Sequence, residues 1–79
     1  MHYVYILQSI TYPTKYYTGR TSDIKRRIAE HNRHKSEYSS RWKPWSLKSY
    51  VAFNSKEQVI SFEQYLKTPS GRAFAKKRL

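Results

Sequence analysis

The 79 residues predict a single domain that spans residues 1–79. The absence of cysteine excludes a disulfide framework and a thiolate zinc site. The longest apolar run, from Tyr3 to Leu7, is too short to cross a bilayer or to form the apolar region of a signal peptide. These features favour a cytoplasmic protein with no membrane partner.

The chain is strongly basic. Sixteen Lys and Arg residues against five Asp and Glu residues give a formal net charge of +11. This density of positive charge, together with eight tyrosines, is typical of a protein that binds a phosphate backbone. The same charge would also suit a surface that serves solubility, or one that docks on an acidic protein or an anionic membrane.

Two strands are predicted at the start of the chain. The segment from His2 to Gln8 is rich in aromatic and β-branched residues and is apolar on both faces, so we expect it in the middle of a sheet. Residues Ser9 to Lys15 include a proline and predict a hairpin loop. The segment from Tyr16 to Gly19 then returns antiparallel.

A helix is predicted from about Ser22 to Arg33, with Thr21 or Ser22 as its cap. At helical spacing, one stripe carries Ile24, Arg27, Ile28 and His31. Cationic groups are unusual on an inward stripe. They either extend outward from its edge or line a pocket between the helix and the sheet.

The middle of the chain predicts a loop and a third strand. Residues 32–41 have no periodicity and indicate an exposed, mobile loop. Trp42 and Trp45 flank Lys43 and a proline, and their indoles either stack on nucleic-acid bases or close the edge of a small core. Strict alternation from Leu47 to Phe53 predicts the strand, with Leu47 on the same face as Val51.

A second helix is predicted after the capping box formed by Ser55 and Gln58. Its apolar stripe consists of Val59, Ile60, Phe62 and Leu66. Glu63 lies in the middle of this stripe, where a carboxylate is costly unless it is paired or bound to a metal. Both an ion pair with an arginine and ligation of a divalent metal satisfy this requirement.

A third helix is predicted to begin at Thr68 and Pro69. We expect Ala73 and Phe74 to face inward and Arg72, Lys76, Lys77 and Arg78 to form a basic exterior. The whole pattern predicts an α+β fold in which helices flank a three-stranded antiparallel sheet, in the order β-β-α-β-α-α.

Several short motifs in this order resemble the GIY-YIG nuclease family, and most closely its small single-domain members. They are Tyr3-Val4-Tyr5, then Tyr17-Thr18-Gly19, then Arg27 eight positions after that glycine, and Glu63 on a later helix. The similarity covers nearly the whole chain. It implies the same fold, the GIY-YIG endonuclease fold, and a metal-dependent endonuclease that hydrolyses phosphodiester bonds in DNA or a related nucleic acid.

The resemblance also implies roles for individual residues. Tyr5 and Tyr17 would stand beside the scissile phosphate, Arg27 would supply positive charge and His31 would assist. Glu63 would ligate a divalent metal, Mg²⁺ in the first instance or Mn²⁺. Together with the charge pattern, it leads us to expect nucleic-acid contacts at Arg20, Lys25, Arg26, Trp42, Lys43, Arg72 and Lys76.

The chain departs from the family pattern at three places. Tyr3 replaces the first glycine of the first motif, and Thr18 replaces the isoleucine of the second. The asparagine that many members carry on a helix after the metal glutamate is absent, and Ser70 is the nearest small polar residue. The alternative function is therefore a non-catalytic nucleic-acid-binding module that retains the fold, and a third possibility is a basic adaptor for an acidic protein.

Overall fold

The computed structural model describes residues 1–33 and 40–79. Its elements are β1 (His2–Ser9), β2 (Tyr16–Thr21), α1 (Ile24–His31), β3 (Trp45–Phe53), α3 (Lys56–Leu66) and α4 (Pro69–Arg78). The strands form an antiparallel sheet in the order β2-β1-β3. The α+β fold and the order β-β-α-β-α-α are thus confirmed. Most of the predicted loop, residues 34–39, lies outside the described residues.

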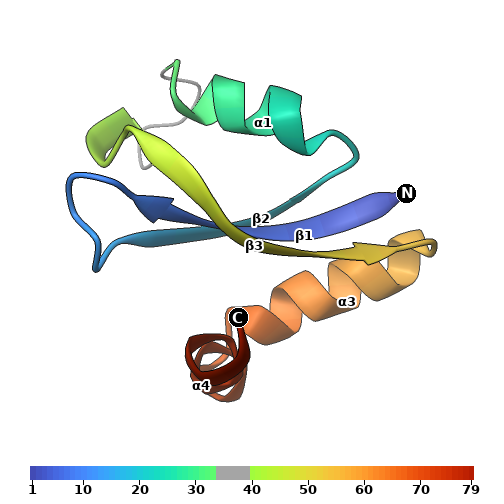
Figure 1. Ribbon diagram of the computed structural model, residues 1–79. Helices are drawn as coiled ribbons and strands as arrows, with labels where there is room; N and C mark the ends of the chain where they lie inside the picture. The colour runs from blue at the N-terminus through green and yellow to red at the C-terminus, as the bar shows by residue number, and fades with distance from the viewer. Residues whose placement is uncertain (34–39) are drawn as a thin grey trace.

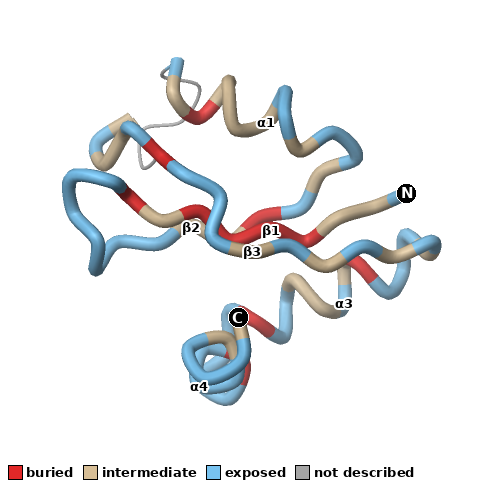
Figure 2. Tube along the Cα trace, in the orientation of Figure 1, coloured by how far each residue is buried: buried red, intermediate tan, exposed pale blue. Residues whose placement is uncertain are grey.

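The sheet separates two hydrophobic clusters, with β1 at the centre of both. Figure 1 shows α1 on one side of the sheet and α3 and α4 on the other. Val4 and Ile6 of β1 pack against Val59 and Leu66 of α3. On the α1 side, the cluster is formed by Tyr5, Leu7 and Trp45, with Tyr17, Ile28 and Trp42 packed against it. The buried stretch of β1 is visible as a red band in Figure 2. The expectation that this strand is covered on both faces is confirmed.

Side-chain caps start all three of these helices. Ser55 and Thr68 cap α3 and α4 as predicted, and Pro69 is the first residue of α4. The prediction for α1 was wrong in detail, because its cap is Asp23, whose carboxylate accepts a hydrogen bond from the backbone N–H of Arg26. Thr21 instead belongs to β2, which is two residues longer than expected. The helix also ends earlier, at His31.

An irregularity in β3 changes which side chains share a face. Ile6 pairs with Ser49, but the next residue, Leu7, pairs with Leu47, so the register shifts by one residue. Leu47 therefore lies on the α1 side with Tyr50, and the expectation that it shares a face with Val51 was wrong. The strand also begins earlier, at Trp45, which is buried.

Helix α4 packs through other residues than those expected. Ala75 and Leu79 contact the hydrophobic cluster between the sheet and α3, whereas Ala73 is exposed. Phe74 is 37% exposed and contacts the rings of Phe62 and Tyr65. None of the helices in residues 1–33 and 40–79 has the length and apolar character that a membrane span requires.

Candidate active site

The pairing of β1 with β2 makes room for the Tyr5 side chain. Tyr5 lies opposite Gly19 in the register. A Cβ atom on Gly19 would lie 2.6 Å from the Tyr5 hydroxyl oxygen and 3.0 Å from a ring carbon of Tyr17. Glycine is thus required here by the close approach of two phenol rings. Any larger residue at position 19 would therefore collide with the Tyr5 side chain.

Helix α1 directs two polar side chains toward Tyr5. Arg27 and His31 are one helical turn apart, so both face the sheet. Arg27 Nε donates a hydrogen bond of 3.3 Å to the Tyr5 hydroxyl, and His31 Nε2 lies 2.9 Å from the same oxygen. Arg27 Nη1 also donates to Glu30 Oε1 at 2.9 Å. The result is a hydrogen-bonded chain from Glu30 through Arg27 and Tyr5 to His31.

Tyr17 completes the group from the edge strand β2. Its ring centroid is 4.5 Å from that of His31 and 6.3 Å from that of Tyr5. The Trp45 ring meets the Tyr17 ring edge-on, with the two ring centroids 6.5 Å apart. The four residues predicted as catalytic, Tyr5, Tyr17, Arg27 and His31, therefore lie together between α1 and the sheet. Of the two alternatives for the cationic groups on this helix, the structure shows the second: Arg27 and His31 point toward the sheet and do not extend outward from the edge of the stripe.

Burial controls the protonation of this group. Burial raises the pKa of Tyr5 to about 12, although the hydrogen bond and positive charge of Arg27 act in the opposite direction. Burial, followed by the charge of Arg27, lowers the pKa of His31 to about 4. The hydrogen bond to Glu30 raises the pKa of Arg27. Near neutral pH the site thus contains a neutral phenol, a neutral imidazole and a charged guanidinium.

Glu63 is on α3, which lies on the side of the sheet opposite α1, and its carboxylate reaches Arg20 of the edge strand β2. Its Oε1 accepts a hydrogen bond from Arg20 Nε at 3.2 Å, and its Oε2 accepts one from Lys67 Nζ at 2.8 Å. Only 15% of its side chain is exposed. Its charge still contributes to the raised pKa of Tyr5. Of the two sequence-based interpretations, the structure contains the ion pair.

The residues expected to contact nucleic acid are spread over the molecule. Lys25 and Arg26 are exposed on α1, and Arg72 and Lys76 are exposed on α4. Arg20 is exposed on the edge strand. Trp42 and Lys43 are half-buried. The Trp42 ring contacts Tyr12 at 5.1 Å and lies under Lys15 Nζ at 4.9 Å.

Two partners were missed by the sequence analysis. Glu30 orients Arg27, and the spacing of three residues on one helix was a usable signal for this pair. Arg20 pairs with Glu63, which is 43 positions away, so no local spacing could indicate it.

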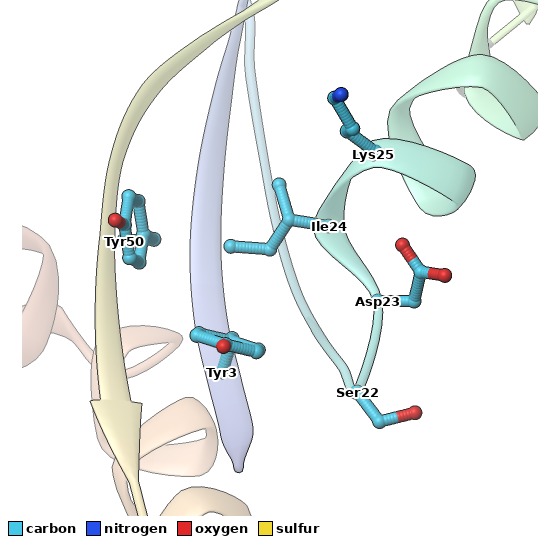
Figure 3. Close-up of a pocket in the computed structure, with 6 residues that line it drawn as sticks. All are labelled: Tyr3, Ser22, Asp23, Ile24, Lys25 and Tyr50. Atoms are coloured by element: carbon cyan, nitrogen blue, oxygen red, sulfur yellow. The ribbon is translucent and has the colours of Figure 1, made fainter.

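A separate pocket of about 340 Å³ lies where α1 begins. Figure 3 shows its residues, with Ile24 directed toward Tyr3 and Tyr50 and the Asp23 carboxylate directed away from them. The Asp23 carboxylate is the helix cap and accepts from the backbone. None of the four residues predicted as catalytic, Tyr5, Tyr17, Arg27 and His31, lines this pocket. The pocket therefore does not support a catalytic role for the residues that line it.

Comparison with known proteins supplies the family. Residues 1–78 match the model of the GIY-YIG catalytic domain. A UPF0213 protein of Streptococcus pyogenes serotype M3 is 38% identical over 72 residues, which are 90% of this chain and 76% of the relative. A UPF0213 protein of Halobacterium salinarum is 35% identical over 68 residues, or 85% of this chain and 86% of the relative.

A solved structure is also similar. The solution NMR structure of a UPF0213 protein from Bacillus halodurans superposes with a TM-score of 0.57 at 36% sequence identity, covering 95% of this chain and 79% of that one. The match to the family model and the identity to these relatives extend over nearly all of the chain. The chain therefore belongs to the GIY-YIG nuclease superfamily, together with these UPF0213 proteins.

Proposed function

We propose that this protein is a metal-dependent endonuclease that hydrolyses phosphodiester bonds in DNA or a related nucleic acid. Membership of the GIY-YIG superfamily supports a nuclease. The single observation that carries the proposal is the hydrogen-bonded chain of Glu30, Arg27, Tyr5 and His31. Such a chain fixes a guanidinium in place before substrate binds, as electrostatic stabilisation of a transition state requires.

Exposure divides the four residues into two roles. The Arg27 side chain is 33% exposed and Tyr17 is half-buried, so both can contact a bound phosphate. We assign to Arg27 the stabilisation of the negative charge on the oxygens around the pentacovalent phosphorus. Tyr5 and His31 are each only 1% exposed. They act as positioning residues that hold Arg27 and Tyr17.

Protonation and exposure also distinguish Tyr5 from Tyr17 as the residue that acts on the attacking water. A phenol with a pKa of about 12 is protonated near pH 7, so Tyr5 is a poor proton acceptor. Tyr17 is the more exposed of the two tyrosines. We therefore propose that Tyr17 orients the water that attacks the phosphate.

The chemistry of Glu63 is compatible with a divalent metal. Mg²⁺ is commonly held by one or two carboxylates together with substrate phosphate oxygens and water. Glu63 supplies one such carboxylate, and its present partners, Arg20 and Lys67, have side chains that are 45% and 54% exposed and can turn toward solvent. When bound there, Mg²⁺ or Mn²⁺ would polarise the scissile phosphate and stabilise the leaving oxygen.

A second candidate function is a nucleic-acid-binding module without turnover. The observation that favours it is that both oxygens of Glu63 are engaged in ion pairs. Binding alone does not separate the two functions, because both predict it.

Cleavage assays on labelled single-stranded and duplex oligonucleotides, with Mg²⁺, with Mn²⁺ and with a chelator, test the proposal. We expect cleavage by the wild-type protein only with a metal, and a loss of about 10²- to 10³-fold in rate for Arg27→Ala. We expect Glu63→Gln to abolish metal-dependent cleavage while binding stays equal or tightens, because the variant loses a negative charge.

Arg33→Ala is the matched control, since Arg33 is an exposed arginine that donates to the carbonyl oxygen of Ala29 within the same chain segment. Circular dichroism checks that each variant folds. If the wild-type protein binds the oligonucleotides and leaves all of them intact with either metal, the non-catalytic module is correct. If it has no affinity at low salt, both functions are wrong.

A further inference from the structure

A basic groove runs between β2 and α4, on the side of the sheet opposite α1. Its volume is about 970 Å³. Figure 1 shows α4 on that side. Five basic side chains line the groove, namely Lys15, Lys48, Lys67, Arg72 and Lys76, and no acidic side chain among residues 1–33 and 40–79 does. We call this feature the α4 groove.

Of the five basic side chains, the two on α4, Arg72 and Lys76, have the fewest contacts that offset their positive charge. Lys67 pairs with Glu63, Lys48 donates to the carbonyl oxygen of Leu79, and Lys15 lies over the Trp42 ring. Within residues 1–33 and 40–79, neither Arg72 nor Lys76 forms an ion pair. Both are exposed and one helical turn apart, so their charges face the groove together.

The groove also contains aromatic surface and meets the candidate active site. Tyr16 lines the groove and is 44% exposed. Tyr17, which contacts His31 in the candidate site, lines the groove as well. Because β2 is the edge strand of the sheet, a strand of nucleic acid can pass from one feature to the other around this edge.

We propose that the α4 groove binds a single-stranded segment of nucleic acid that flanks the cleaved bond. Positive side chains that follow a backbone, beside an aromatic ring on which a base can stack, are the combination that single-strand-binding surfaces use. In a duplex, the bases are paired and stacked on one another, so they cannot offer a face to Tyr16. The inference rests on the proposed function and adds the form of substrate that the site takes.

The test measures binding of a fluorescein-labelled oligothymidylate of about 12 nucleotides and of a duplex of the same length, with chelator present to prevent cleavage. The test variant is Arg72→Ala/Lys76→Ala. The matched control is Lys77→Ala/Arg78→Ala, which removes two charges from the same helix at exposed positions that do not line the groove. Circular dichroism verifies that both variants fold.

We expect the wild-type protein to prefer the single strand. The test variant should bind it about tenfold more weakly, and the slope of log K against log salt should fall by about 1.4, as expected when two phosphate contacts are lost. The control should change affinity less than about twofold. Equal losses in the two variants, a preference for duplex, or no binding at low salt would each overturn the proposal.

Cleavage assays keep this proposal separate from the previous one. If Arg27→Ala removes cleavage while the two α4 variants behave alike, the endonuclease stands and the groove is wrong. If the groove variant loses single-strand binding while the wild-type protein cleaves nothing, the groove stands and the endonuclease is wrong.

Discussion

Gly19 is the residue on which the position of Tyr5 depends. We expect Gly19→Ala to destabilise the protein, because the new Cβ would lie 2.6 Å from the hydroxyl oxygen and 2.8 Å from the adjacent carbon of a ring that is only 1% exposed. Overpacking costs about 1–3 kcal/mol, which exceeds the gain of about 0.5–1 kcal/mol from replacing glycine in a strand. Urea unfolding measures the change in the free energy of unfolding.

A double-mutant cycle with Tyr5→Phe provides the control. Since the closest contact is with the hydroxyl oxygen, the cost of Gly19→Ala should be smaller in the Tyr5→Phe background. A cost that is the same in both backgrounds would show that the two residues are not coupled, which contradicts the packing described above.

His31 should make stability depend on pH. Its pKa is lowered from 6.5 to about 4 in the folded protein, so between these values the unfolded chain binds more protons than the native protein. Stability therefore falls as the pH decreases from about 6.5 through 4, by about 3 kcal/mol in total. Among residues 1–33 and 40–79, the titratable groups that act on the imidazole are Tyr5, Tyr17, Arg27 and Glu30, of which the Arg27 charge opposes protonation and Glu30 favours it.

Urea unfolding of the wild-type protein and of His31→Gln over this pH range isolates the effect. The carboxylates titrate in both proteins, so the difference between the two unfolding free energies reports on residue 31. We expect the wild-type protein to lose its advantage as the pH decreases. Parallel curves would mean that the imidazole titrates alike in the folded and unfolded chains.

At the level of elements, most of the fold follows from local patterns. The aromatic and β-branched residues of β1 and the capping residues Ser55 and Thr68 act within a few positions, so the sequence predicts their structure directly. The shift in β3 is different, because it depends on how Ile6 and Leu7 pair across the sheet. No period-2 pattern within one strand contains that information.

In the candidate site, too, local spacing predicts some features, whereas others depend on contacts between distant elements. The helical spacing of Arg27 and His31 predicts that both face one side of α1, and the sheet then brings Tyr5 and Tyr17 to them. The environment of Glu63 could not be predicted in this way, because Arg20 reaches it from another element. Likewise, α4 packs through Ala75 and Leu79, and which of its residues meet the core depends on how the helix docks on the rest of the fold, which a one-dimensional pattern does not define.

At the level of the whole molecule, charge works against stability. The net charge of +11 is confined to extents of 30 × 25 × 18 Å. Two like charges 20 Å apart in water repel by about 0.2 kcal/mol, and the excess of cations makes such pairs outnumber attractive ones. At about 0.01 M salt the Debye length is close to the size of the molecule, whereas at about 0.15 M it is only about 8 Å.

Added salt should therefore stabilise this protein. We expect the free energy of unfolding in urea to rise by roughly 1 kcal/mol between about 0.01 M and 0.15 M NaCl, with an unchanged m-value, because screening relieves long-range repulsion while neighbouring ion pairs persist. Choline chloride should act like NaCl, since the effect depends on ionic strength and not on the cation. A decrease in stability would mean that the pairs of Arg27 with Glu30 and of Glu63 with Arg20 and Lys67 outweigh the repulsion. Repulsion among the basic side chains would then lower the free energy of unfolding only slightly. A bound anion would not be needed to offset it.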